Sequence, residues 1–147
     1  MELRGKQLGL VGLGRIGRAV AEKAPAFGMS VAYTARTAAD VPNATHMSLD
    51  RLLSTSDVVS LHCPMTPDTT HLIDQKALTR MKRTAYLINT SRGPVVNEAA
   101  LVWALNERLI AGAALDVFMV EPAKDNPLFQ LEQVIATPHL GASTTRG

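Results

Sequence analysis

Short apolar runs of strand length alternate with helix-like segments along the whole 147-residue chain. The candidate strands are Leu8–Val11, Ser30–Tyr33, Val58–Leu61, Tyr86–Asn89, Gly112–Leu115 and Val134–Ala136. This alternation is typical of β-α-β units, which build a parallel sheet because each connection must cross back over it. We therefore predict an α/β fold with a doubly wound parallel sheet and helices on both of its faces.

The segments between the runs carry signals for helices and loops. After the first run, apolar residues recur at the three-to-four spacing of a helical face, namely Ile16, Val20, Ala24 and Phe27, with Gly28 ending the helix. Later helices are expected to begin after the polar N-caps Ser48, Asp74 and Asn97. Two Pro-, Asn- and Asp-containing segments are expected to be loops, Thr37–Thr45 and Val120–Pro127.

Composition limits the class of protein. The chain is 46% hydrophobic and 19% charged, as expected for one globular domain. Its net charge of +2 is small and is not concentrated in a block, which makes nucleic acid or a membrane surface a poor partner. The single cysteine, Cys63, fits a reducing compartment, and no stretch reads as a signal peptide or membrane span. We predict a cytoplasmic protein.

A glycine-rich turn follows the first candidate strand directly, in the sequence Gly12-Leu13-Gly14-Arg15-Ile16-Gly17. In a dinucleotide-binding Rossmann fold, Gly12 would permit the tight turn, Gly14 the approach of a pyrophosphate, and Gly17 the packing of helix on strand. The first amides of the helix, around Arg15 and Ile16, would face the phosphates. A turn without a ligand is the alternative, but the strand before it and the helix after it favour dinucleotide binding.

The end of the second strand bears on which dinucleotide binds. An acidic residue there would hold the ribose hydroxyls of NAD, but the sequence is Thr34-Ala35-Arg36-Thr37. Arg36, flanked by Thr34 and Thr37, suits a 2′-phosphate because a guanidinium pairs with two phosphate oxygens at once. We therefore favour NADP over NAD. The alternative is that Arg36 is a solvated surface residue and the cofactor is NAD.

Three ionisable residues each lie a few positions beyond an apolar run: Arg92, Glu121 and His139. Taken singly, each has an ordinary explanation as a surface or loop residue. Because parallel strands end at one edge of a sheet, and ligands bind at that edge, we expect the three side chains to gather there. A cation, a carboxylate and an imidazole together suggest proton transfer beside a bound anion.

The segments around these residues resemble the D-isomer-specific 2-hydroxyacid dehydrogenases over essentially the whole chain. They are the glycine turn, Leu61-His62-Cys63-Pro64, Asn89-Thr90-Ser91-Arg92-Gly93, Leu115-Asp116-Val117-Phe118 with Glu121-Pro122, and Thr137-Pro138-His139-Leu140-Gly141. The resemblance implies an NAD(P)-dependent oxidoreductase that acts on small 2-hydroxy or 2-oxo acids.

The resemblance also implies residue roles. Arg92 would hold the carboxylate and oxo group of a 2-oxoacid, and His139 would exchange a proton with the substrate oxygen during hydride transfer. Glu121 would orient the imidazole and hold its proton, and Asp116 would lie near the nicotinamide amide. The resemblance further assigns the lining of the cofactor cleft to Cys63, Pro64, Thr90 and Gly141. Metal ligation is not expected.

Enzymes of this family resemble a two-lobed clamp in which the dinucleotide domain is inserted into a substrate lobe. Residues 1–147 correspond to the dinucleotide-binding domain, and we expect the substrate lobe to be absent from this chain. The isolated chain would bind cofactor with negligible turnover, because half a cleft is poor at excluding water and at positioning the substrate. A homodimer through this domain is possible, and an exposed apolar surface on Leu101–Leu109 would be consistent with it.

Two features of the sequence bear on the identity of the substrate. The missing acid and the short connection Ala38–Met47 look like the glyoxylate and hydroxypyruvate reductases, which we favour. The segment from Pro138 to Thr144 instead resembles the 3-phosphoglycerate dehydrogenases. A different class, a nucleotide-sensing interaction module similar to corepressors of the C-terminal-binding-protein type, has no partner-binding motif in its favour.

Overall fold

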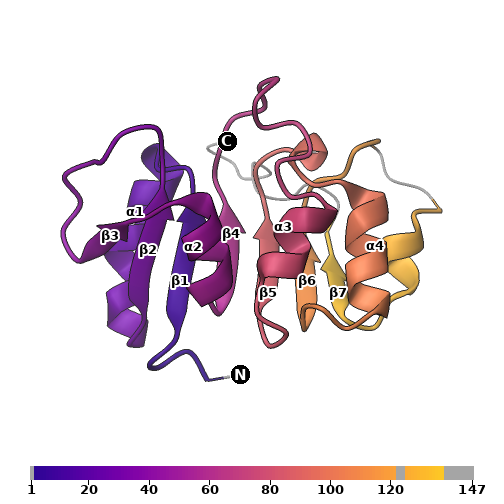
Figure 1. Ribbon diagram of the computed structural model, residues 1–147, viewed down its shortest axis with the longest axis horizontal. Helices are drawn as coiled ribbons and strands as arrows, with labels where there is room; N and C mark the ends of the chain where they lie inside the picture. Colours follow the sequence, from indigo (N-terminus) through magenta and orange to yellow (C-terminus); the bar gives the residue numbers. More distant parts are fainter. Residues whose placement is uncertain (1, 122–124, 138–147) are drawn as a thin grey trace, which may run out of the picture.

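The computed structural model describes residues 2–121 and 125–137. In these ranges the strands form one parallel sheet in the order β3-β2-β1-β4-β5-β6-β7 (Figure 1). Their bounds are β1 Gln7–Val11, β2 Ser30–Thr34, β3 Ala44–His46, β4 Val58–Leu61, β5 Tyr86–Asn89, β6 Gly112–Leu115 and β7 Val134–Ala136. The chain moves outward from β1 in one direction and then from β4 in the other. The predicted doubly wound parallel sheet is therefore confirmed, with its switch point between β1 and β4.

The helices are α1 Arg15–Lys23, α2 Leu49–Thr55, α3 Gln75–Arg80 and α4 Glu98–Asn106. The predicted N-caps are confirmed, because the side chains of Ser48, Asp74 and Asn97 accept hydrogen bonds from the amides of Arg51, Ala77 and Ala100. No helix within the described ranges is long and apolar enough to cross a membrane.

Alternation along the strands sends side chains to two layers. Leu8 and Leu10 of β1 pack in a cluster with Ala21 and Ala24 on the α1 side of the sheet. Val11 joins the larger cluster on the other face, which includes buried side chains of α2, α3 and α4: Leu52, Leu53, Ala77, Leu78, Leu101 and Leu105. Both faces carry helices, as predicted, and the packed layers hold the strand ends in fixed register.

Three details differ from the prediction. Residues 44–46, assigned largely to a loop, form the edge strand β3. The sequence does not reveal this strand, because Thr45 and His46 are exposed and need not be apolar. Ile16 and Phe27 do not belong to a buried helical face, since both are exposed, whereas Ala24 is buried. Helix α1 ends at Lys23 and continues as a 3-10 turn because Pro25 lacks an amide donor. Gly28, at φ 78°, then ends the segment as predicted.

Asp57 ties three segments together at the amino edge of the sheet. Its carboxylate accepts the backbone amide of Gln7 at 2.9 Å and the ammonium of Lys82 at 2.8 Å. Burial acts to raise the pKa of Asp57, but the hydrogen bonds and charge of Lys82, with the Gln7 amide, lower it below its ordinary value overall. The ion pair therefore contributes to stability only while Asp57 is charged.

Helix α4 contains most of the segment Leu101–Leu109, where an exposed apolar surface would be consistent with a homodimer. Leu101 and Leu105 are fully buried against the sheet, and Val102, Trp103 and Leu109 are partly buried. None of the large apolar side chains in Leu101–Leu109 is highly exposed, so this segment offers little apolar surface, and the homodimer stays a prediction from the sequence.

Candidate functional site

The turn between β1 and α1 shows a separate role for each glycine. Gly12 has a φ of 92°, and a Cβ there would lie 2.9 Å from the backbone nitrogen of Cys63. A Cβ on Gly17 would lie 2.9 Å from the carbonyl oxygen of Gly12. Around Gly14, in contrast, a Cβ would meet no atom within 4 Å. Two glycines are thus required by packing, and the third leaves the backbone open toward the cavity beside it.

This cavity of about 530 Å³ lies at the carboxyl ends of β1, β4 and β5. It is lined by Gly14, Arg15, Ile16, His62, Cys63, Pro64, Met65, Thr90, Ser91 and Arg92. Residues that the sequence assigned to the cofactor or to catalysis from three separate segments therefore meet around one space. Gly14 is the N-cap of α1 without a side-chain cap, so the positive end of the helix dipole faces the same edge of the sheet.

His62 and Ser91 were not among the predicted site residues, yet they line this cavity together with Met65. His62 accepts or donates a hydrogen bond with the hydroxyl of Ser60 at 2.8 Å, and burial lowers its pKa, which favours a neutral imidazole. Arg92 was selected because it lies just beyond the end of a strand. The same rule applied to β4 selects His62, which directly follows that strand.

The thiol of Cys63 is buried in the wall of the same cavity. Burial raises its pKa, and a hydrogen bond to its own backbone only partly offsets this. Cys63 therefore acts as a small apolar wall residue beside Gly12, whose turn fits closely against its backbone.

Asn89 fixes the loop that carries Arg92. Its side chain is almost fully buried, donates to the carbonyl of Arg92 at 3.0 Å, and accepts from the amide and hydroxyl of Ser91 at 3.0 and 2.9 Å. The guanidinium of Arg92 donates to the carbonyl of Ser91 at 2.8 Å and is otherwise exposed at the cavity. A fixed backbone thus presents a cationic fork to whatever binds there.

The loop after β6 lies next to the Arg92 loop. A Cβ on Gly93 would overlap the carbonyl oxygen of Phe118, so the backbones of the two loops are in direct contact. Asp116 is buried, its amide donates to the carbonyl of Asn89, and its carboxylate accepts the hydroxyl of Thr137. Glu121 is exposed on the same loop, and neither acid lines the cavity. His139 and Gly141 lie outside the described residues.

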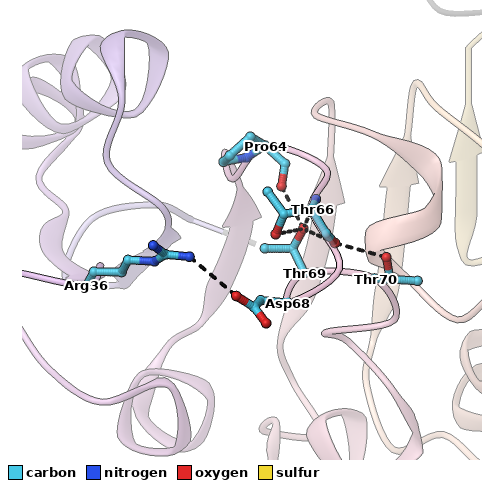
Figure 2. A network of polar contacts seen from close by, with 6 residues as sticks. All are labelled: Arg36, Pro64, Thr66, Asp68, Thr69 and Thr70. Atoms are coloured by element: carbon cyan, nitrogen blue, oxygen red, sulfur yellow. Dashed lines mark hydrogen bonds and ion pairs between the residues drawn. The ribbon is translucent and has the colours of Figure 1, made fainter.

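The residues predicted to select the dinucleotide lie beyond the cavity, at the end of β2. Thr34 is half-buried and its carbonyl accepts the amide of Gly12 at 2.9 Å, whereas Thr37 is exposed. Arg36 reaches across to Asp68 on the loop after β4, with Nη2 and Oδ2 separated by 3.4 Å (Figure 2). No local pattern in the sequence predicts this pair, because the two residues lie on loops far apart in the chain.

These features fit a dinucleotide. Gly14 leaves the helix amides approachable by a pyrophosphate, and Arg15 and Arg92 add positive charge along the cavity. Ile16 and Met65 present exposed apolar surface in its wall, which suits a planar ring. Among the described residues, no cluster of three or more His, Cys, Asp or Glu side chains could hold a metal ion.

Comparison with known proteins agrees with this geometry. The sequence profile of the D-isomer specific 2-hydroxyacid dehydrogenase family, NAD binding domain, matches residues 1–141. The glyoxylate reductase of Thermofilum pendens is 50% identical over 97% of this chain and 44% of that protein. The D-3-phosphoglycerate dehydrogenase of Mycobacterium tuberculosis is 46% identical over 97% of this chain and 28% of that protein. The chain thus spans less than half the length of these curated relatives.

Several similar solved structures contain a dinucleotide. The NAD-dependent formate dehydrogenase of Staphylococcus aureus, in complex with NAD, has a TM-score of 0.93 and 38% identity, over 97% of this chain and 44% of that one. An acyclic imino acid reductase in complex with NADPH and D-Arg has a TM-score of 0.90 and 39% identity, over 95% and 45%. The glycine turn, the cavity at the switch point and the matched profile lead to one conclusion: the chain belongs to the D-isomer specific 2-hydroxyacid dehydrogenase family and corresponds to its NAD-binding domain.

Proposed function

We propose that this chain is the cofactor-binding domain of a 2-oxoacid reductase of the glyoxylate or hydroxypyruvate type, with NADP preferred over NAD. The observation that carries the proposal is the cavity in which the glycine turn, the segment 62–65 and the segment 90–92 meet. The substrate class is supported by the 50% identity to a glyoxylate reductase, and the cofactor preference by Arg36 at the end of β2.

Each part of the cavity has a task in this proposal. The amides at the start of α1 and the side chain of Arg15 bind the pyrophosphate. A nicotinamide dinucleotide, when bound, supplies the hydride that is exchanged with the substrate carbon. Arg92 binds the substrate carboxylate, because its fork matches two carboxylate oxygens and the Asn89 network keeps its backbone fixed. Cys63, Pro64 and Thr90 line the wall beside the cofactor and limit the access of water.

The acid–base pair in this proposal is Glu121 with His139. His139 exchanges the proton with the substrate oxygen, and Glu121 orients the imidazole. Asp116 binds the amide of the nicotinamide, and Gly141 borders the cofactor. The proposal is supported by the direct packing of the loop that precedes Glu121 against the Arg92 loop.

The isolated chain is proposed to bind cofactor with negligible turnover. Its curated relatives are more than twice as long, and closure of a cleft supplies a large part of the rate in such two-part sites. We expect glyoxylate turnover by the chain alone to remain far below about 1 per second, an ordinary enzymatic rate. A cytoplasmic location and a homodimer stay predictions from the sequence.

The test begins with calorimetric titration of the chain with NADPH and NADH. The NADPH-saturated chain is then titrated with oxalate, an unreactive dicarboxylate close in size to glyoxylate. We expect Arg92→Gln to weaken oxalate binding at least tenfold and to leave NADPH affinity nearly unchanged. Arg83→Gln is the matched control, because Arg83 is exposed and precedes β5 at the opposite edge of the sheet. If neither dinucleotide binds, the domain assignment is wrong; if oxalate binds the Arg92 variant equally well, the role of Arg92 is wrong.

A 3-phosphoglycerate dehydrogenase is the second candidate, and the 46% identity to a member of that class supports it. Its substrate carries a phosphate in addition to the carboxylate, so it demands more positive charge than glyoxylate. Competition of 3-phosphoglycerate and glycerate for the NADP-saturated chain separates the two candidates. Binding of the phosphorylated acid alone would favour the dehydrogenase.

A further inference from the structure

Arg36 and Asp68 face one another from two different loops at the carboxyl edge of the sheet (Figure 2). Arg36 lies two residues beyond β2 and Asp68 lies on the loop after β4, and these strands flank β1 and its glycine turn. Their side chains are 88% and 83% exposed. An ion pair with this exposure contributes little to stability, so a stronger anion can displace the carboxylate at small cost.

Hydrogen bonds within the loop fix the backbone on both sides of Asp68. The hydroxyl of Thr69 donates to the carbonyl of Pro64 at 2.7 Å and accepts the amide of Thr66 at 2.8 Å (Figure 2). The hydroxyl of Thr70 donates to the carbonyl of Thr66 at 3.0 Å. Asp68 lies between these threonines, and the same loop begins with Pro64, in the wall of the cavity. The backbone that carries Asp68 is therefore tied to the site.

The loop that carries Arg36 is anchored as well. The hydroxyl of Tyr33 accepts the amide of Ala39 at 2.8 Å and donates to the carbonyl of the same residue at 3.1 Å. The ring of His46 bonds the carbonyl of Ala35 at 3.1 Å, next to Arg36 itself. The pair consequently joins two fixed backbones rather than two free loop tips.

We infer that Asp68 sets the balance between NAD and NADP by competing with a 2′-phosphate for Arg36. The inference rests on the proposed dinucleotide binding at this edge. A 2′-phosphate that reaches Arg36 must displace the Asp68 carboxylate and then stays close to its negative charge. NAD, which has hydroxyls at this position, meets no such repulsion. Asp68 therefore weakens a preference for NADP that Arg36 alone would make stronger.

The size of the effect follows from Coulomb's law at an exposed site. Unit charges about 4 Å apart in water change an equilibrium by roughly fivefold. Because the phosphate carries more than one charge but the site is open to solvent, we expect Asp68→Asn to tighten NADP⁺ binding by about three- to tenfold. The gain should shrink at about 1 M salt, where screening acts within roughly 3 Å.

The test is calorimetric titration of the chain with NADP⁺ and NAD⁺ at low and high salt. The variants are Asp68→Asn, Arg36→Gln, and the two combined. Glu107→Gln is the matched control, because it removes one exposed negative charge after α4, at the opposite edge of the sheet. We expect Asp68→Asn to tighten NADP⁺ binding, leave NAD⁺ within about twofold, and have a smaller effect on NADP⁺ binding when Arg36 is replaced.

The results separate this inference from the proposed function. If Arg36→Gln weakens NADP⁺ binding but Asp68→Asn behaves like Glu107→Gln, the dinucleotide assignment stands and the role of Asp68 is overturned. Equal gains for NAD⁺ and NADP⁺ in Asp68→Asn would also overturn it. If the unmodified chain binds neither dinucleotide, the proposed function itself fails.

Discussion

Alanine at Gly17 and alanine at Gly14 should damage different properties of the protein. At Gly17 the added methyl group would lie 2.9 Å from the carbonyl oxygen of Gly12, which is backbone and cannot rotate away. Forcing such a contact costs about 1–3 kcal/mol, and the better helix propensity of alanine returns up to about 1 kcal/mol. We expect a net loss of about 1–2 kcal/mol in the free energy of unfolding, or a Tm lower by roughly 2–8 °C.

At Gly14 the methyl group would meet no atom within 4 Å. Its φ of −85° is accessible to alanine, so the only expected cost is that of a poorer N-cap, about 0.5 kcal/mol. The same methyl group would occupy the space through which a pyrophosphate approaches the amides of α1. We expect Gly14→Ala to weaken NADPH binding at least tenfold, or by about 1.4 kcal/mol.

Urea unfolding and calorimetric titration of both variants check this separation of stability from binding. The role of Gly14 in cofactor binding is contradicted if Gly14→Ala is destabilised as much as Gly17→Ala, or if it binds NADPH as tightly as the unmodified chain. Unchanged stability of Gly17→Ala would refute the packing role assigned to the third glycine.

Two further predictions concern titratable groups. The folded-state pKa of Asp57 is lowered, so its contribution to stability is complete above the unfolded carboxyl value of about 3.9 and is lost as pH falls through the lower folded value. Urea midpoints from pH 2 to 6 should show this loss, and Lys82→Met should reduce both its size and the free energy of unfolding at pH 7, by about 0.5–1 kcal/mol. Because burial raises the pKa of Cys63, iodoacetamide should alkylate it much more slowly at pH 7.5 than it alkylates glutathione. Saturation with NADPH should slow the reaction again, and an equal rate with and without NADPH would argue against the place of Cys63 in the cofactor wall.

The parts of the fold that the sequence predicts correctly are those with an apolar run. The bounds of β4, β5 and β6 match the predicted runs, because strands inside a parallel sheet are covered and must be largely apolar. The bounds of the edge strand β7 also match, because its run is apolar although Ile135 is 69% exposed. The edge strand β3 has no such requirement, and its exposed Thr45 and His46 read as a loop. Ile16 has the spacing of a helical face, but its side chain lines the cavity. An apolar side chain there can contact a bound planar ring instead of the core.

The candidate site also has parts that can be predicted from the sequence and parts that cannot. The glycine turn is a local signal and is readable in sequence, and the position of Arg92 follows from the rule that parallel strands end at one edge. The Arg36–Asp68 pair joins residues 32 positions apart and exists because β2 and β4 both flank β1. That adjacency depends on the order of strands in the sheet, which apolar periodicity does not contain.

Dinucleotide binding in the cavity beside the glycine turn is tested most directly by two-dimensional amide NMR during titration with NADPH, which locates the bound cofactor residue by residue. We predict saturable binding at one equivalent, with the largest shifts in the segments 14–17, 62–65 and 90–92 and in Arg36, and small shifts at the amino edge around Asp57. No binding, or shifts concentrated at the amino edge, would contradict the claim that the cavity beside the glycine turn is the cofactor site.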